Sequence, residues 1–181
     1  MHRNRNGHRH QFDARIASRQ LDMAVPLAPR PAEAELAIAF LGASGTVTGS
    51  RYLVDDGKTR VVIDSGLFQG SRDLRALNWA SVPPDVAAAD LILLTHAHLD
   101  HSGALPRMAR LGWAGTILCT RATAALCDIL LPDSGHLQEK DAEYANRKGF
   151  SKHKPALPLY TVQDAERALK QFSNVPFGKP T

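Results

Sequence analysis

The sequence predicts an α/β fold, in which short apolar strands alternate with helices. One observation is the continuous apolar run from Leu91 to Leu94, which is typical of a strand buried on both faces of a sheet. Another is that helical patterns with recognisable start and stop residues follow such runs. With 181 residues, of which 44% are hydrophobic, the chain can form one domain of ordinary size or part of a larger one.

Residues 1–35 predict a flexible extension, because they are rich in Arg, His, Asn, Pro and Ala and lack sustained periodicity. We interpret its histidines as part of a solvated tail rather than as metal ligands: His2, His8 and His10. A translation start at Met23 is an alternative hypothesis, which intact Met1 in the native protein would contradict. Residues 36–181 are predicted to form a partial folded domain.

Three strands are predicted at the start of this domain, at residues 36–41, 52–54 and 60–64. Glycine-containing turns separate them, at residues 42–45 and 55–58. The second turn has the sequence Asp-Asp-Gly-Lys, which suits a tight hairpin between antiparallel strands.

The next predicted strand covers residues 91–95, and a helix follows over about residues 102–111. Gly112 is the stop signal of this helix. Its expected buried stripe consists of Leu105, Met108 and Leu111. Residues 115–120 predict a further strand.

Pro132 is expected to end a helix over residues 122–131, and Asp133 to cap a more polar helix that runs through about Lys148. Residues 149–159 predict an exposed loop. Residues 161–164 have the spacing of a capping box, with Asp in the usual Glu position. They start a helix with one apolar face, formed by Val162, Ala165, Leu169 and Phe172.

Composition excludes some classes of protein. Cys119 and Cys127 are expected at the end of a strand and inside the next helix, which is not a disulfide framework, so we expect a cytoplasmic location. No window is apolar enough to span a membrane, and the N-terminus lacks the apolar core of a secretory signal. The net charge of +4 does not by itself indicate a nucleic-acid partner.

Residues 95–101 read Thr-His-Ala-His-Leu-Asp-His and form the most informative motif of the chain. In an extended-to-turn segment alternate residues point the same way, so His96 and His98 can hold one ion. Asp100 and His101 are placed to address a second ion. Four ligand-type residues so close together after an apolar strand favour a metal site of the zinc type over surface histidines of a turn.

Two such ions lower the pKa of a bridging water to near neutrality and stabilise charge on an attacked phosphoryl or carbonyl oxygen. A dinuclear site suits phosphodiester hydrolysis, because both the attacking and the leaving oxygen need stabilising. The motif therefore predicts a hydrolase.

Residues 95–101 resemble the signature of the metallo-β-lactamase fold. Other segments are similar to the β-CASP branch of that superfamily, which contains RNA-processing nucleases such as the endonuclease subunit of the pre-mRNA 3′-end cleavage factor: residues 45–50, 64–70, 130–139 and 141–148. The resemblance covers roughly residues 36–178. It implies the N-terminal part of an αββα sandwich, incomplete in this chain, with RNA as the substrate class.

The resemblance also implies roles for single residues. His96 and His98 would ligate a first Zn²⁺ ion, Asp100 and His101 a second, and Asp64 would support the site from close by. Asp100, as a ligand with base character, and His98 are the catalytic candidates.

The family's third motif, a His, and its fourth, an Asp, would lie beyond Phe177. We therefore expect a truncated chain with two ligands per zinc ion, whose hydrolysis is weak or absent. Apolar surface left uncovered favours assembly with a partner or with a second copy of the chain.

The remaining polar candidates are weaker. His136 is interpreted as structural or exposed, and Gln69 and Arg72 as rim or plain loop residues. His153 is interpreted as part of a solvated loop that could touch a phosphate backbone together with Arg147 and Lys148. Two other functions stay open: a hydrolase of small esters, thioesters or lactams, and a non-catalytic chain that binds RNA or a partner subunit.

Overall fold

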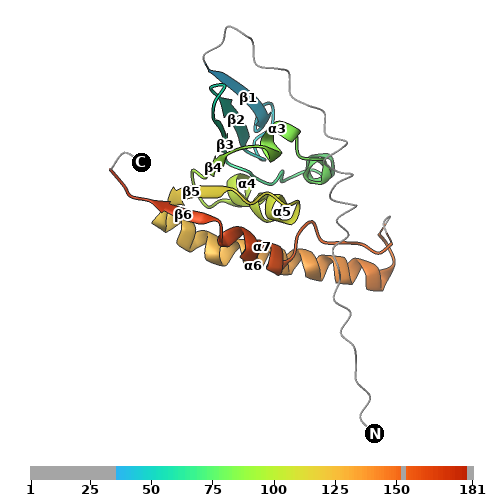
Figure 1. Ribbon diagram of the computed structural model, residues 1–181. Helices are drawn as coiled ribbons and strands as arrows, with labels where there is room; N and C mark the ends of the chain where they lie inside the picture. The colour runs from blue at the N-terminus through green and yellow to red at the C-terminus, as the bar shows by residue number, and fades with distance from the viewer. Residues whose placement is uncertain (1–35, 152–153, 179–181) are drawn as a thin grey trace.

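A computed structural model of the protein describes residues 36–151 and 154–178, so the predicted extension and His153 lie outside the described residues. The described chain forms a six-stranded sheet with its strands in sequence order (Figure 1). The strands are β1 (Ala37–Gly42), β2 (Arg51–Asp55), β3 (Arg60–Ile63), β4 (Leu91–Leu93), β5 (Thr116–Thr120) and β6 (Phe172–Val175). Strands β1 to β3 pair antiparallel, and β3 to β6 pair parallel.

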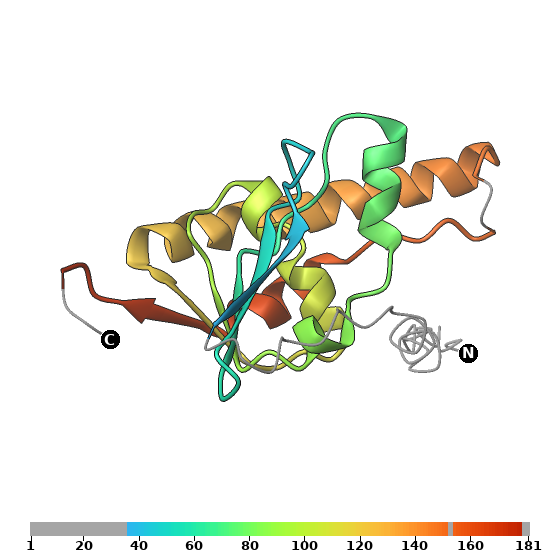
Figure 2. The same cartoon turned by 90° about the horizontal axis from the view of Figure 1, so that it is seen from above.

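The helices connect the parallel strands. They are α2 (Arg72–Ala76), the 3₁₀ helix η1 (Leu77–Trp79), α3 (Pro84–Ala87), α4 (Leu99–Ser102), α5 (Leu105–Arg110), α6 (Arg121–Lys148) and α7 (Val162–Leu169). Helix α7 packs against both α5 and α6, and α6 extends across most of the width of the molecule in Figure 2. No helix in the described part of the chain has the length and apolar character needed to cross a bilayer.

The core lies on one face of the sheet. The register aligns one buried residue from each of four neighbouring strands, Leu53, Val62, Ile92 and Ile117. They pack with residues of α5, α6 and α7 in one cluster. The sequence therefore places its β-branched and leucine side chains where helices cover the sheet.

The opposite face of the sheet remains open among the described residues, which corrects one prediction. The run from Leu91 to Leu94 was expected to be buried on both faces, but Leu93 is 43% exposed. Ile38 and Phe40 on β1 are also exposed, by 53% and 66%. The physical reason is that the crossover helices pack on one side of this sheet only.

Several local predictions are confirmed. Strands β2 and β3 form the expected hairpin, whose turn is fixed by Asp56 Oδ1 accepting from the amides of Lys58 and Thr59. Thr161 and Asp164 form the capping box of α7. Gly112 follows α5 with φ 97°, in the left-handed region that favours glycine.

The prediction that a helix ends at Pro132 is wrong. Helix α6 is a single helix of 28 residues that continues through Pro132, with Thr120 as its N-cap and Gly149 as its left-handed C-cap. Tertiary packing on both sides of the proline explains the continuity: Leu131 is fully buried, and Ser134 Oγ lies 2.7 Å from the hydroxyl of Tyr160. The helix expected over 102–111 is found as α5, which starts at Leu105, and the short helix α4 before it was not predicted.

The C-terminal part of the described chain also differs from expectation. Phe172 was expected on the apolar face of a helix, but α7 ends at Leu169 and Phe172 begins strand β6. Pairing with β5 along the edge of the sheet overrides the helical spacing of these apolar residues. The short helices α2, η1 and α3 were not predicted either, because none is long enough to show a periodic pattern.

Candidate metal centre

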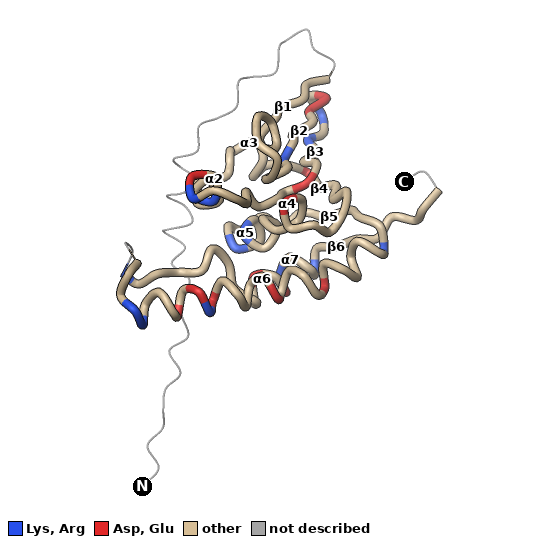
Figure 3. The backbone as a smooth tube through the Cα atoms, turned by 180° about the vertical axis from the view of Figure 1, so that it is seen from behind, with Lys and Arg blue, Asp and Glu red and all other residues tan. Residues whose placement is uncertain are grey.

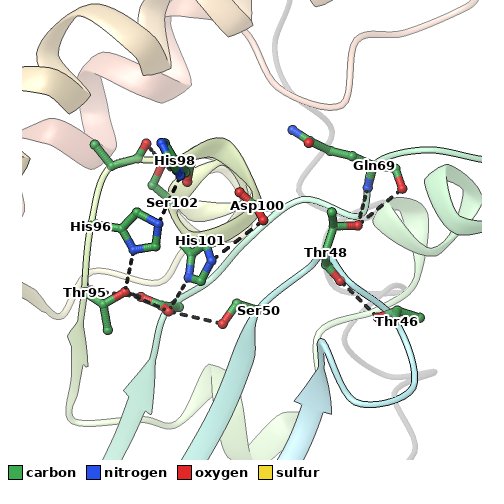
Figure 4. Close-up of polar contacts among 12 residues, drawn as sticks. Thr46, Thr48, Ser50, Gln69, Thr95, His96, His98, Asp100, His101 and Ser102 are labelled. Atoms are coloured by element: carbon green, nitrogen blue, oxygen red, sulfur yellow. Dashed lines mark hydrogen bonds and ion pairs between the residues drawn. The ribbon is translucent and has the colours of Figure 1, made fainter.

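The predicted site residues come together where two neighbouring strands end. Asp64 follows β3, and residues 94–98 lead from β4 into α4, which carries Asp100 and His101 (Figure 4). Because β3 and β4 are parallel, their carboxyl ends meet at one edge of the sheet, where α/β folds place their ligands. His98 is the N-cap residue of α4.

Asp64 is the centre of the hydrogen-bond network at this edge. Its side chain is buried and accepts hydrogen bonds from the amide of Thr95 (2.9 Å), the hydroxyl of Thr95 (2.9 Å) and the hydroxyl of Ser50 (3.1 Å). Its backbone has φ 59°, a left-handed conformation that is uncommon for a residue other than glycine. Such strain persists where surrounding contacts fix it, here including the bond from the Asp64 amide to the carbonyl of Leu93.

His101 is oriented by this buried carboxylate. Its Nδ1 lies 2.7 Å from Asp64 Oδ2. A histidine that donates Nδ1–H to a carboxylate keeps Nε2 available as a metal ligand. Nε2 of His101 lies 3.7 Å from Asp100 Oδ2, so an imidazole nitrogen and a carboxylate oxygen lie close to each other here. Asp64 thus orients the ring of His101, and its supporting role in a metal site stays a prediction.

His96 and His98 form the second pair of donors. His96 Nε2 lies 3.2 Å from His98 Nδ1, and the hydroxyl of Thr95 contacts His96 Nδ1 at 3.0 Å. Two nitrogens bound to one tetrahedral zinc ion at about 2.0–2.1 Å lie about 3.3–3.4 Å apart. The two imidazoles therefore present nitrogens at the spacing that one shared ion requires.

The electrostatics of His96 favour its metal-binding form. Burial lowers the pKa of His96 below its ordinary value, and the neighbouring His101 and His98 lower it further, although Asp64 and Asp100 act in the opposite direction. A lowered pKa keeps the imidazole neutral at physiological pH, and neutral imidazole is the form that ligates metals.

Backbone hydrogen bonds hold helix α4, which carries two of the candidate ligands. The amide of Ser50 donates to the carbonyl of Asp100 at 2.8 Å, and the amide of Ser65 donates to the carbonyl of His101 at 2.7 Å. Gly66 fits tightly beneath this helix, since a Cβ atom added there would lie 1.6 Å from the carbonyl oxygen of Asp100. Close approach of two backbones requires glycine at this position.

The donor set fits a divalent ion of the zinc type only in part. Imidazole nitrogens and a carboxylate are the right ligand chemistry. Each pair, however, supplies two donors, and nowhere in residues 36–151 and 154–178 do three or more His, Cys, Asp or Glu side chains form a group able to hold a metal ion. A catalytic zinc ion takes three protein ligands as a rule.

Sequence reasoning missed the residues that position the ligands. Ser50, Thr95 and Gly66 all lie in the motifs singled out above, but their contacts with Asp64 and with helix α4 depend on the fold. Of the weaker candidates, His136 is exposed on α6, and Gln69 and Arg72 are exposed as well. Cys119 and Cys127 are buried and unpaired, as expected.

The model of the metallo-beta-lactamase superfamily matches residues 45–164 of this chain. The chain belongs to this superfamily, whose members bind divalent metal ions, so the predicted family and fold class are confirmed. The matched span includes Asp64 and the whole motif of residues 95–101.

Comparison with curated relatives indicates which branch of the superfamily the chain resembles. The chain is 35% identical over 142 residues to "Ribonuclease TTHA0252" of Thermus thermophilus, covering 78% of this chain and 28% of the relative. It is 31% identical over 144 residues to "Transcription termination factor FttA" of Methanocaldococcus jannaschii (80% and 21%). It is 34% identical over 104 residues to "Integrator complex subunit 11" of Danio rerio (55% and 17%). These relatives are β-CASP nucleases, which agrees with the predicted branch.

The chain spans about a quarter or less of the length of these relatives. Among solved structures it is similar to MEM-A1, a subclass B3 metallo-β-lactamase isolated from a soil metagenome library. That match has 17% identity and a TM-score of 0.40, and it covers 85% of this chain and 48% of the other.

Proposed function

We propose that this chain carries the ligand-bearing strand ends of a zinc-dependent ribonuclease of the β-CASP type. In this proposal His96 and His98 hold one zinc ion, and Asp100 and His101 hold a second. The observation that supports it most directly is the 3.2 Å separation of His96 Nε2 and His98 Nδ1. RNA as the substrate class rests on the relatives, one of which is named as a ribonuclease.

Zinc ions in this position would supply a water of lowered pKa and would stabilise negative charge on an attacked phosphoryl oxygen. The residues of the chain do the orienting. Asp64 accepts a hydrogen bond from Nδ1–H of His101 and so presents Nε2 beside the carboxylate of Asp100. The hydroxyl of Thr95 contacts both Asp64 and His96, so it couples the two halves of the site. Asp100 acts as a ligand whose second oxygen has base character.

Zinc binding to the purified chain tests the ligand assignment separately from activity. His98→Ala removes one of the two donors for the first ion, so zinc affinity measured by calorimetry is expected to fall by at least about tenfold. The matched control is His136→Ala, because His136 is exposed on α6 and far along the chain from the motif. Equal affinities in the wild type and His98→Ala would contradict the assignment.

RNA cleavage is the second measurement. Because each ion has two donors among the described residues, the proposal expects slow cleavage of an RNA oligonucleotide that depends on zinc and stops when a chelator is added. A chain that ignores RNA but opens a thioester would belong to the small ester and thioester hydrolases instead. A non-catalytic function is favoured by the two-donor count for each ion, and it expects RNA retention that a chelator does not change and no zinc in the native protein.

A further inference from the structure

A cavity of about 260 Å³ lies beside the segment that follows Asp64. Its walls come from the start of β2, from the segment after Asp64, from the η1–α3 connection and from α5. The residues that line it include no Asp or Glu, and two of them are arginines: Arg51 and Arg107. The remaining walls are largely apolar, with Phe68 and Met108 among them.

Arg51, which lines this cavity, has an unsatisfied donor. Its Nη2 donates to the hydroxyl of Ser65 at 2.9 Å. Its Nε is buried, and no acceptor in the described part of the chain reaches it. A buried N–H without a partner is rare in folded proteins, and a guanidinium that presents one is prepared to bind an anion.

Arg107 adds a second, rigidly held positive charge. It is 6% exposed, and its guanidinium donates to the backbone carbonyls of Asn78, Trp79 and Ala80. Helix α5 carries basic but no acidic residues, as the blue segment in Figure 3 shows. Carbonyl oxygens satisfy the donors of Arg107 but do not neutralise its charge.

Neither arginine has a carboxylate partner among the ion pairs of residues 36–151 and 154–178. Burial lowers the pKa of Arg51 to about 10. Burial, and then the charges of Arg51 and Arg110, lower the pKa of Arg107 to about 10. Both side chains stay charged at neutral pH, so two positive charges face one cavity without a counterion, whereas buried charges are as a rule paired.

We propose that this cavity binds a phosphate-type oxyanion, with the free Nε–H of Arg51 as the principal donor and Arg107 as the second charge. A guanidinium edge matches the oxygens of a phosphate group, and two arginines match its double negative charge. The apolar walls leave room for an organic group attached to the anion. None of the candidate metal ligands lines this cavity.

Calorimetric titration of the full chain with inorganic phosphate and with adenosine monophosphate, both in the presence of a chelator, tests the proposal. One anion per chain is expected to bind. Arg51→Met is expected to weaken this binding by at least about tenfold, because it removes a charged hydrogen bond. Arg72→Met is the matched control, since Arg72 is an exposed arginine outside the cavity, and it is expected to bind like the wild type.

A direct readout keeps the test decisive if Arg51→Met does not fold. The Nε–H resonance of Arg51 in the wild type, assigned by its loss in Arg51→Lys, is expected to shift on titration with phosphate. Tighter binding of the nucleotide than of phosphate would identify a nucleotide-borne phosphate as the ligand, and equal binding would identify the free ion. No binding at millimolar concentrations, an unshifted Arg51 resonance, or unchanged affinity in Arg51→Met would each overturn the proposal.

Discussion

Asp64 shows how one carboxylate organises a site without being assigned as a ligand. It accepts hydrogen bonds from Thr95 and Ser50 and lies at hydrogen-bond distance from Nδ1 of His101. These partners come from two separate segments of the chain, residue 50 and residues 95–101, so the orientation of the His101 ring depends on both. At this scale the chemistry of the candidate site rests as much on the residues behind the ligands as on the ligands themselves.

Asp64→Asn tests this dependence. The amide has nearly the same shape, but it is a weaker acceptor and its NH₂ group cannot accept the bonds from Thr95, Ser50 and His101 together. Zinc affinity is expected to fall by about 10- to 100-fold, measured by calorimetry. Asp73→Asn on the surface of α2 is the control, and it should bind zinc normally. Wild-type affinity in Asp64→Asn would show that the ring of His101 needs no such support.

The thiols give a prediction on pH. Burial, and to a smaller extent the neighbouring Cys119, raise the pKa of Cys127 to about 12. The native thiol therefore stays protonated between pH 7 and 9, so labelling by a disulfide reagent is expected to stay slow across this range and to become fast in urea. Because the unfolded thiol releases its proton near pH 9, this group stabilises the fold below that pH and loses its contribution above it. Rapid labelling of the native protein at pH 8 would contradict the burial.

At the scale of elements, the sequence identified the first five strands, the β2–β3 hairpin and the capping box of α7, because each has a local signal. The candidate ligands and Asp64 could be named for the same reason: they lie in short motifs. The course of α6 through Pro132 and the strand at Phe172 could not be predicted, because packing against α7 and pairing with β5 decide them. The exposure of Leu93 depends likewise on which face the helices cover.

Pro132→Ala distinguishes the single helix from the two helices that the sequence predicted. Inside α6 the proline lacks the N–H that would bond to the carbonyl of Asp128. Alanine restores that bond, so the free energy of unfolding is expected to rise by about 1–3 kcal/mol, less the small effect of a more flexible unfolded chain. Chemical denaturation measures it. An unchanged or lower stability would indicate that the helix breaks at this residue.

At the scale of the whole molecule, the sheet has one face under helices and one face open among the described residues. The open face carries apolar side chains, among them Ile38, Phe40 and Leu93. Phe40 also packs edge-on against Tyr52, with ring centroids 5.6 Å apart. In an αββα sandwich such a face packs against a second sheet, so it is a surface made for contact.

Phe40→Ser is expected to lower the self-association of this chain, measured as average mass by light scattering over a range of concentrations. The change removes a large exposed ring, so thermal stability should be little affected. Phe150→Ser is the matched control, because Phe150 is equally exposed but lies beyond the end of α6, away from the sheet. If both variants associate like the wild type, the open face does not drive association.

The backbone contacts next to the candidate ligands bear on when a metal ion can bind. Backbone hydrogen bonds from Ser50 and Ser65, and the tight fit of Gly66, hold helix α4 in place. The entropic cost of ordering this segment is therefore part of the folding step, so the candidate ligands are already in position before an ion binds. We therefore expect a metal ion to load after folding and to exchange at this edge without unfolding of the chain.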